Sequence, residues 1–473
     1  MDLAELKNKK VAVLGFGSEG QAVVDYLLKN GIRPTLLDEA PPDEWEQDRF
    51  NKLNSLDLKT SFGPDAFKNL VNFDVAFRSP GIRHRSLELI AAEQQGVTIT
   101  SQVNWFFEHC RAKIIGVTGT KGKGTTAALI TEILNAGVRQ RGGNKVYLTG
   151  NIDGIQPLEF LDALTEKDII IYELSSFQLQ DLHKSPTLAI VLMITAEHLD
   201  YHKNLVEYHE SKIPIVKYQT ASDIAIINID YPASSALAKI GQGQKVFVSK
   251  HHPVEVGCYI NGDDFKISGV TNTNLANNEL TIHTGALKLK GKHNLENAAA
   301  AILASLYIGA TVQEIEQGLS KFKGLPHRLQ LVARRGGVSF YDDSIATTPD
   351  SAVAAITSFT EPLIIILGGS DKQVDMAELG LAIAAKTNIK AVILLGETAG
   401  KIKQAIVAAG EFNGSIIEGA SSMPEVFLEI NKIAKPGDTV LLSPASASFD
   451  MFKNYKERGK QFTNLAKAFS LKI

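Results

Sequence analysis

The residues best suited to chemistry lie in one glycine-rich segment, Gly116–Thr126. Backbone N–H groups of such a loop can surround the phosphates of a nucleotide, while Lys123 contacts the β- and γ-phosphate oxygens and a hydroxyl contacts Mg²⁺. Two residues depart from the usual phosphate-loop pattern, because Val117 replaces its first small residue and Gly124 replaces the Ser or Thr after the lysine. We therefore expect Thr125 to supply the hydroxyl. A ligand-free turn with an exposed lysine is the less favoured alternative, since a strand is expected before the loop and a helix after it.

A second glycine-rich turn, Gly15–Gly20, has the spacing Gly-x-Gly-x-x-Gly. Its backbone N–H groups and a following helix could approach a pyrophosphate, and Asp38, at the end of the next expected strand, could hold a ribose. A tight turn without any ligand fits these residues about equally well. The same geometry could also hold either NAD or the pyrophosphate of a UDP-sugar.

Polar residues follow two apolar runs that are expected to end near the phosphate loop. Ile169–Tyr172 precedes Glu173, and Leu188–Ile194 precedes a polar stretch that contains His198. Each cluster alone is more typical of a solvated strand end. Because parallel strands end at one edge of a sheet, and because hard cations prefer oxygen ligands, the two clusters together favour a Mg²⁺ site.

The elements that position these residues follow an alternation of short β-branched runs and longer amphipathic stretches, which predicts an α/β fold with parallel sheets. Strands are expected at Val11–Leu14, Ile114–Val117 and Val338–Tyr341, with a helix over Gln21–Asn30 after the first and one from Thr125 after the second. Three such starts predict three domains, at 1–108, 109–325 and 326–473. The polar texture between residues 201 and 291 predicts a small β-rich insert in the middle domain.

Composition narrows the class of protein. The chain has 473 residues, 44% of them hydrophobic and 21% charged, which fits ordinary globular domains. A net charge of −3 excludes a broadly basic nucleic-acid binder. The two cysteines, Cys110 and Cys258, cannot form a disulfide framework, and the apolar runs are shorter than a membrane span. We expect a cytoplasmic protein that binds neither nucleic acid nor membrane.

Taken together, the motifs resemble the Mur ligases of bacterial cell-wall synthesis, and most closely the branch that adds glutamate to UDP-N-acetylmuramoyl-L-alanine. The resemblance extends in order along essentially the whole chain. It is carried by Ser79–Ile82, Gly116–Thr126, Gly150–Ile152, Glu173–Leu179, His198, Lys212, Gly291–Asn294, Asn297, Gly324–Arg328, Asp343–Ser344, Gly368–Gly369, Lys372, Leu441–Ala445 and Ser448. It implies a Rossmann-like N-terminal domain, a central ATPase domain of the phosphate-loop type with the β-rich insert, and a Rossmann-like C-terminal domain.

The resemblance also implies cofactors and residue roles. ATP would be used with two Mg²⁺ ions, and the catalytic group would be Lys123, Glu173, His198 and Lys212, the last as a carbamate. The metal ligands would be Thr125, Glu173, His198 and carbamylated Lys212. The ATP site would consist of Gly119, Thr120, Gly122, Lys123, Gly124, Thr125, Thr126, Asn297, Arg328 and Asp343.

For the other two substrates the resemblance implies separate sites. UDP-N-acetylmuramoyl-L-alanine would contact Ser18, Glu19, Asp38, Ser79, Gly81, Asn151, Ser175 and Gln178. Glutamate would contact Ile345, Lys372, Ser448 and Phe449. ATP would convert the substrate carboxylate into an acyl phosphate, which the amine of glutamate would attack through a tetrahedral intermediate. A monomer is expected.

Several alternatives remain open at this stage. A nicotinamide-dependent dehydrogenase would use the first turn but would leave the phosphate loop unexplained. A folylpolyglutamate synthetase would share the ATP loop but is not expected to carry the Gly15–Gly20 turn. A non-catalytic nucleotide-binding regulator is suggested by Gly124 and Ile345. Ile345 also stands where D-glutamate ligases usually have a lysine, so L-glutamate is nearly as well supported as D-glutamate, which we favour because it is the commoner substrate.

Overall fold

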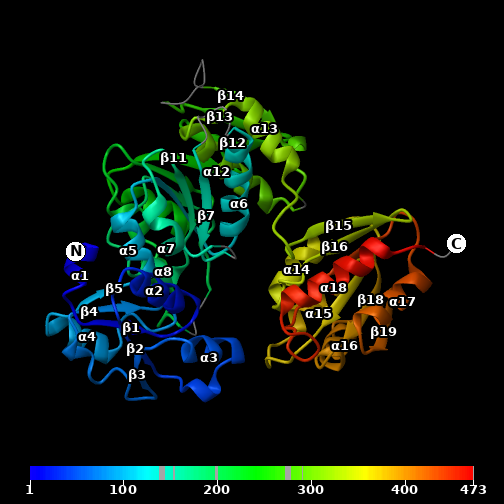
Figure 1. Cartoon of the computed structure of the whole chain (residues 1–473). Helices are drawn as coiled ribbons and strands as arrows, with labels where there is room; N and C mark the ends of the chain where they lie inside the picture. Colours follow the sequence, from blue (N-terminus) through cyan, green and yellow to red (C-terminus); the bar gives the residue numbers. More distant parts are fainter. Residues whose placement is uncertain (138–143, 153–154, 198–200, 272–278, 290, 472–473) are drawn as a thin grey trace. The chain divides into compact units, whose positions relative to one another are not determined.

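The computed structural model describes residues 1–137, 144–152, 155–197, 201–271, 279–289 and 291–471. These residues form an α/β fold with three separate sheets (Figure 1). The chain divides into two compact units. The first unit comprises Met1–Leu287 and Leu295–Ser320 and contains the first two sheets, and the second comprises Lys288–Asn294 and Lys321–Ile473 and contains the third.

The first sheet is parallel and has the Rossmann-like order β3-β2-β1-β4-β5. Its strands are β1 Val11–Leu14, β2 Thr35–Asp38, β3 Lys59–Phe62, β4 Val75–Arg78 and β5 Thr98–Thr100. Its helices are α1 Leu3–Leu6, α2 Ser18–Lys29, α3 Gln47–Asn54, α4 Leu87–Gln94 and α5 Gln102–His109, with single 3₁₀ turns at Pro42–Glu44 and Leu70–Asn72. The first strand was predicted correctly.

The predicted start of α2 at Gln21 was wrong by three residues. The helix begins at Ser18, with Gly17 as its N-cap, and the Gln21 N–H donates to the Gly17 carbonyl at 2.9 Å. Ser18 and Glu19 therefore lie in the first helical turn, where their side chains project from a fixed backbone. Gly20 is also helical, and a Cβ there would lie 2.0 Å from the Gly15 carbonyl, so the turn and the helix require a glycine at this contact.

The second sheet has nine strands among the described residues, in the order β14-β13-β12-β11-β10-β9-β6-β8-β7. They are β6 Lys113–Thr118, β7 Val146–Gly150, β8 Ile169–Glu173, β9 Leu188–Val191, β10 Ile224–Asn228, β11 Gln244–Ser249, β12 Gly257–Asn261, β13 Asp264–Ser268 and β14 Leu280–His283. The chain places β7 and β8 on one side of β6 and β9 on the other. The carboxyl end of β6 is therefore a topological switch point, where ligands bind in open α/β sheets.

The helices of this part are α6 Lys123–Ala136, α7 Pro157–Phe160, α8 Ser176–Leu179, α9 Leu205–Glu210, α10 Pro214–Lys217, α11 Pro232–Ala236, α12 His293–Tyr307 and α13 Val312–Lys321, with 3₁₀ turns at Leu161–Ala163, Leu237–Lys239 and Thr284–Ala286. The predicted extent of the insert was wrong. Its first half contains α9 to α11 and the parallel strands β10 and β11 of the main sheet, and only β12 to β14 form an antiparallel extension.

The third sheet has the order β15-β16-β20-β17-β18-β19 and is parallel except for β15, which runs antiparallel to β16. Its strands are β15 Gln330–Arg335, β16 Val338–Asp342, β17 Leu363–Gly368, β18 Ile389–Leu395, β19 Ser415–Ala420 and β20 Thr439–Leu442. Its helices are α14 Pro349–Thr357, α15 Ala377–Ala384, α16 Ala399–Ala408, α17 Met423–Ile433 and α18 Tyr455–Ala468. The predicted Rossmann-like character of this part is confirmed.

One apolar core connects the first two sheets. Helix α5 supplies three consecutive buried aromatic residues, Trp105 to Phe107, which lie between the sheets in sequence and in space. Trp105 packs against Phe77 of β4 with ring centroids 5.5 Å apart, and Phe106 and Phe107 pack against Tyr172 of β8 at 5.6 and 5.4 Å. This packing fixes the glycine turn of the first sheet relative to the strand ends of the second. Within the described part of the chain, none of the helices combines the length and apolar character needed to cross a bilayer.

Candidate active site

The phosphate loop joins the carboxyl end of β6 to α6. The helix begins at Lys123, two residues before the predicted start at Thr125, because Gly122 acts as its N-cap with φ +89°. A Cβ at Gly122 would lie 2.2 Å from Oδ1 of Asn297. The two predicted ATP-site segments therefore meet at this glycine, where the backbone must approach its neighbour closely.

Two lysines lie against the loop. The Lys123 ammonium donates to the carbonyls of Gly119 and Thr120 at 3.0 Å each. The Lys212 ammonium is buried, donates to the Gly119 carbonyl at 3.5 Å and lies 4.6 Å from the centre of the Tyr208 ring. Burial, aided by the positive charge of Lys123, lowers the pKa of Lys212 to about 7. The structure thus brings together two of the four predicted catalytic residues.

Thr120 connects the loop to the segment that follows β9. Its hydroxyl lies 2.9 Å from the Tyr208 hydroxyl and accepts a hydrogen bond of 2.9 Å from the Thr195 N–H. Lys121 of the loop also forms an ion pair of 2.5 Å with Glu197 of the segment that follows β9. Sequence reasoning did not single out Tyr208, although an aromatic residue four positions before Lys212 offered a weak helical-spacing signal.

Oxygen donors suited to Mg²⁺ lie beside the loop. Glu173 ends β8, is buried, and pairs in register with Val117 of β6. Thr125 is buried in the first turn of α6, and the buried Thr126 hydroxyl has no hydrogen-bond partner in the described part of the chain. This donor set fits a hard cation. The described residues contain no group of three or more His, Cys, Asp or Glu side chains arranged for a metal, and His198 lies outside them.

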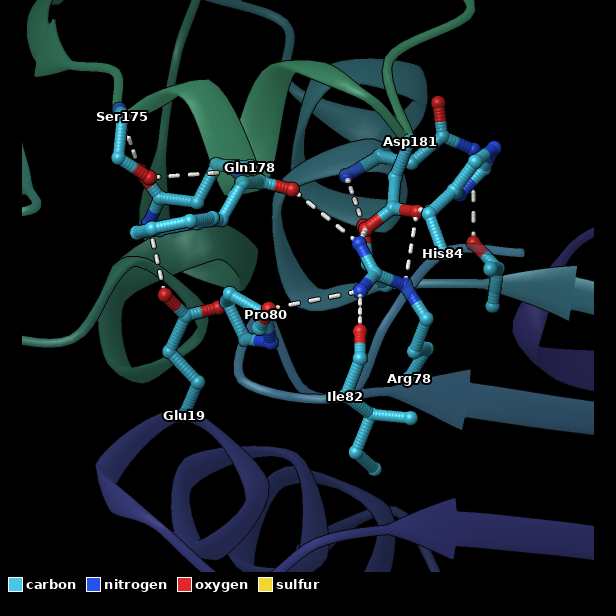
Figure 2. A network of polar contacts seen from close by, with 12 residues as sticks. Glu19, Arg78, Pro80, Ile82, His84, Ser175, Gln178 and Asp181 are labelled. Atoms are coloured by element: carbon cyan, nitrogen blue, oxygen red, sulfur yellow. Dashed lines mark hydrogen bonds and ion pairs between the residues drawn. The ribbon is translucent and has the colours of Figure 1, made fainter. Parts of the chain in front are cut away.

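A chain of polar contacts leads from β8 back to the first sheet (Figure 2). The N–H and hydroxyl of Ser175 donate to Oε1 of Gln178 at 3.0 and 3.2 Å, which fixes the orientation of that amide. Its Nε2 then donates to Oε1 of Glu19 at 2.7 Å. Burial raises the pKa of Glu19 to about 7. Asn151 lies beside the end of β8, since its N–H donates to the Glu173 carbonyl at 2.9 Å. Asn151, Ser175 and Gln178 therefore lie near the carboxyl end of β8, and Gln178 connects this end of the strand to Glu19 of α2.

A buried ion pair accompanies this chain of contacts, and sequence reasoning missed it. Arg78 ends β4 and contacts Asp181 through two hydrogen bonds, Nε to Oδ1 at 3.0 Å and Nη2 to Oδ2 at 2.6 Å. The same guanidinium donates to the carbonyl of Ile82 (Figure 2) and to the carbonyl of Phe177. His84 Nδ1 lies 3.1 Å from Asp181 Oδ1. A charged residue that closes the buried apolar strand β4 was the available signal.

The remaining residues of the predicted UDP site surround the first glycine turn. The Ser79 hydroxyl donates to the Gly15 carbonyl at 3.2 Å. Asp38 accepts the N–H groups of Phe16 at 2.8 Å and Ala40 at 3.0 Å and pairs with Arg49, so both of its oxygens already have partners. Ser18, the first residue of α2, and Gly81, which follows β4, are both exposed.

The predicted glutamate-site residues and two ATP-site residues belong to the second unit. Asp343 is buried, accepts the Leu329 N–H at 2.9 Å and the Ser443 hydroxyl at 2.8 Å, and has its pKa raised to about 7 by burial. Arg458, also buried, donates to the carbonyls of Ser344 and Ala447 and so fixes the two loops on either side. Of the remaining predicted residues, Ser448 is buried, Ile345 is half-buried, and Arg328, Lys372 and Phe449 are exposed.

Three family models match the chain in order. They are the Mur ligase MurD-like N-terminal domain at residues 9–101, the Mur ligase middle domain at residues 117–305, and the Mur ligase glutamate ligase domain at residues 327–446. The chain is 37% identical over 467 residues to a UDP-N-acetylmuramoylalanine--D-glutamate ligase of Acetivibrio thermocellus, covering 98% of this chain and 97% of the relative. It is 35% identical to the protein of the same name from Symbiobacterium thermophilum, with 98% of each chain covered.

Solved structures share the fold. The chain resembles the UDP-N-acetylmuramate-alanine ligase MurC of Thermotoga maritima, with a TM-score of 0.57 and 19% identity over 96% of this chain and 98% of that one. It also resembles MurF of Acinetobacter baumannii, with a TM-score of 0.59 and 15% identity over 98% and 92%. The chain belongs to the Mur ligase family. It is therefore an ATP-dependent amino-acid ligase, and ATP and Mg²⁺ are the cofactors consistent with the family.

Proposed function

We propose that this enzyme adds D-glutamate to UDP-N-acetylmuramoyl-L-alanine during peptidoglycan precursor synthesis, with hydrolysis of ATP to ADP and phosphate. The observation that carries the proposal is identity of 35–37% over nearly the full length of ligases named for this reaction. The full-length match also argues against a dehydrogenase and against a non-catalytic regulator, because neither would need the phosphate loop and the glutamate ligase domain together.

The proposed chemistry begins at the phosphate loop. Lys123 would leave the carbonyls of Gly119 and Thr120 to neutralise charge on the γ-phosphate as the substrate carboxylate attacks it, giving an acyl phosphate and ADP. The amine of glutamate would then attack the acyl carbon, and the tetrahedral intermediate would collapse to the amide as phosphate leaves. Arg328, Asp343 and Asn297 would complete the ATP site.

Two Mg²⁺ ions would supply charge neutralisation and would draw the carboxylate and γ-phosphate together. We propose Thr125, Glu173, His198 and a carbamate on Lys212 as their ligands. Support comes from the buried carboxylate of Glu173, the buried position of Lys212 beside Lys123, and the hard oxygen donors near the loop. A buried lysine is readily neutral, and only the neutral amine can take up CO₂.

The UDP-linked substrate would lie along the joint between the first two sheets. On the side of the first sheet, the residues at or near the Gly15–Gly20 turn are Ser18, Glu19, Asp38, Ser79 and Gly81. On the side of the second sheet, the residues are Asn151, Ser175 and Gln178. We propose domain limits of 1–108, 109–325 and 326–473, which fall between β5 and β6 and between α13 and β15. A cytoplasmic monomer without membrane or nucleic-acid partners completes the proposal.

For the amino acid, Ile345, Lys372, Ser448 and Phe449 would form the pocket. One observation favours a second candidate, L-glutamate: Ile345 is aliphatic, and an aliphatic side chain cannot pair with the distal carboxylate of a substrate. Phe449, which is 68% exposed, would further reshape the pocket.

The test measures phosphate release from ATP with purified enzyme, Mg²⁺, UDP-N-acetylmuramoyl-L-alanine and one glutamate enantiomer at a time. Release that requires both the UDP-linked acceptor and D-glutamate supports the proposal. A strong preference for L-glutamate would establish the second candidate, and release with neither enantiomer would reject both.

A further inference from the structure

Arg458 of α18 is buried without a carboxylate to bind. Its side chain is 0% exposed, and none of its hydrogen bonds in the described part of the chain goes to an Asp or a Glu. Asp450 and Asp342 attract its charge without bonding to it, and burial lowers the pKa of Arg458 to about 10, so it remains a cation at neutral pH. Burying a charge costs free energy unless the charge is paired. Stability alone therefore does not account for an arginine at this position.

The guanidinium holds two loops that leave adjacent strands. β16 and β20 are parallel neighbours, with Asp342 opposite Leu442, so the loops that follow them begin side by side. In the first loop, Ser344 accepts from Nε at its hydroxyl, at 3.0 Å, and from Nη2 at its carbonyl, at 2.9 Å. In the second loop, the carbonyls of Ser446 and Ala447 accept from Nη2 and Nη1 at 3.1 and 3.0 Å. The donors of one planar group thus fix the spacing of the two loops.

Two of these carbonyls belong to peptide bonds that carry predicted glutamate contacts. The Ser344 carbonyl lies in the same rigid plane as the N–H of Ile345, and the Ala447 carbonyl lies in the same plane as the N–H of Ser448. Holding each carbonyl therefore also fixes the direction of the N–H that follows it and the point from which the next side chain starts. Arg458 itself has no exposed surface with which to contact a ligand.

The second loop has a conformation that needs such support. Ala445 has φ +59°, in the left-handed region that residues other than glycine rarely adopt, directly before the two carbonyls. The loop after β17 meets the same point, because a Cβ at Gly369 would lie 2.0 Å from the Ala447 carbonyl oxygen and 3.1 Å from Nη1 of Arg458. Helix α18 is already bound to the sheet by its apolar face, which includes Phe462. The donors of the arginine therefore serve the loops rather than the packing of the helix.

We propose that Arg458 is a positioning residue for glutamate, and that it sets the affinity for this substrate by holding the two peptide planes that begin the walls of the amino-acid pocket. The inference rests on the proposed function, because it takes Ile345 and Ser448 as contacts of glutamate. It assigns Arg458 no contact with the substrate.

The neighbouring ATP-site residue is held independently of Arg458. Asp343 accepts hydrogen bonds from the Leu329 N–H and the Ser443 hydroxyl, and neither donor contacts the guanidinium. Loss of Arg458 should therefore weaken the use of glutamate selectively and leave the use of ATP unchanged. A general loss of folded structure would affect both substrates together.

The experiment measures steady-state phosphate release from ATP while varying the concentration of the glutamate enantiomer that the wild type uses. Arg458→Met removes the donors but keeps an unbranched apolar side chain in the buried space. We expect KM for glutamate to rise about tenfold, because small displacements of binding groups are costly, while KM for ATP stays within about twofold. Arg458→Lys keeps a charge and N–H donors without the planar geometry, so its KM for glutamate should lie between those of the wild type and Arg458→Met.

Phe427→Leu is the matched control for lost stability. Phe427 of α17 packs against Phe462 of α18 with ring centroids 5.5 Å apart, so the change loosens the support of the same helix without removing a hydrogen bond to either loop. Thermal melting compares the stability of this variant with that of the two Arg458 variants. KM for glutamate should be unchanged in Phe427→Leu.

An unchanged KM for glutamate in Arg458→Met, an equal rise in KM for ATP, or the same rise in Phe427→Leu would overturn the role of Arg458. Should Arg458→Met fail to fold, Arg458→Lys decides the question, because KM for glutamate must then rise while KM for ATP does not. A wild type that releases phosphate with neither enantiomer of glutamate would instead overturn the proposed function, and this inference with it.

Discussion

Replacing Arg78 by methionine tests how strongly the first two sheets are held together. The side chains of Arg78 and Asp181 are 0% and 4% exposed, so removing the guanidinium leaves a carboxylate buried without its counterion. Breaking a buried pair in this way costs about 3–5 kcal/mol. Because His84 keeps its contact with Asp181, we expect the lower end of that range, about 3 kcal/mol. This corresponds to a roughly hundredfold change in the unfolding equilibrium.

The assay is urea unfolding followed by tryptophan fluorescence. The chain has two tryptophans, Trp45 and Trp105, and both belong to the part built on the first sheet, so the signal reports on the affected region. Arg33→Met is the matched control, since Arg33 pairs with Asp57 at 2.6 Å but the two side chains are 69% and 95% exposed. Such exposed pairs contribute about 0–1 kcal/mol.

A double variant separates a lost attraction from an uncompensated charge. Arg78→Met combined with Asp181→Leu removes both charges, and we expect it to recover most of the stability lost in the single variant. An Arg78→Met protein as stable as Arg33→Met, or a double variant less stable than Arg78→Met alone, would refute the reasoning.

The remaining predictions concern the phosphate loop and Glu19. Lys123→Ala should abolish ATP-dependent phosphate release while its affinity for the UDP-linked substrate stays unchanged. Lys121→Ala, which removes the exposed lysine paired with Glu197, should keep most activity. If calorimetry showed that Lys123→Ala lost affinity for ATP and for the UDP-linked substrate equally, the assignment would be contradicted. Lys212→Ala should be inactive, and wild-type activity should fall when bicarbonate is stripped at mildly acidic pH and return on its addition; activity that ignores bicarbonate would reject the carbamate. Gly122→Ala should lose ATP binding, because the added Cβ would meet Asn297. Gly31→Ala is the control: Gly31 has φ +76° and open space around it, so this variant should lose only about 1 kcal/mol of stability. Similar ATP affinity in both variants would disprove the close contact. The pKa of Glu19 is about 7 in the folded protein and 4.5 in the unfolded chain, so its contribution to stability is complete below pH 4.5 and is lost as the pH rises through about 7. In urea unfolding, the wild type should therefore lose stability relative to Glu19→Gln between pH 5 and 8. Parallel curves of stability against pH for the two proteins would count against the shift.

The glycine turns were predictable because their constraint is local. Gly15 and Gly122 adopt φ values of +82° and +89°, which other residues rarely reach, and each follows an apolar strand and precedes a helix. That pattern is visible within a dozen residues of sequence. The starts of α2 and α6 were placed too late, since the glycine spacing alone does not show that Gly17 and Gly122 act as N-caps rather than as turn residues.

The insert was misjudged for a physical reason. Polar and turn-forming residues between α9 and β11 resemble those of a small antiparallel sheet, yet Ile224–Asn228 is a buried parallel strand that pairs with β9 and β11. Burial of a strand depends on what covers its two faces, and that information comes from segments that are distant in the sequence. Only the strands β12 to β14 form the antiparallel hairpins that the polar, turn-rich pattern predicts.

The polar contacts between the first two sheets could not be predicted from local sequence patterns. Arg78 and Asp181 are 103 residues apart, and Glu19 and Gln178 are 159 apart, so neither pairing leaves a periodic trace. Their chemistry depends on shared burial: the low dielectric that makes an unpaired Asp181 costly also raises the pKa of Glu19. Arg78 lowers the pKa of Glu19 and Asp181 raises it, and burial is the largest cause of the raised pKa. The buried ion pair thus stabilises the contact between the two sheets, and burial at the same contact keeps the pKa of Glu19 raised to about 7.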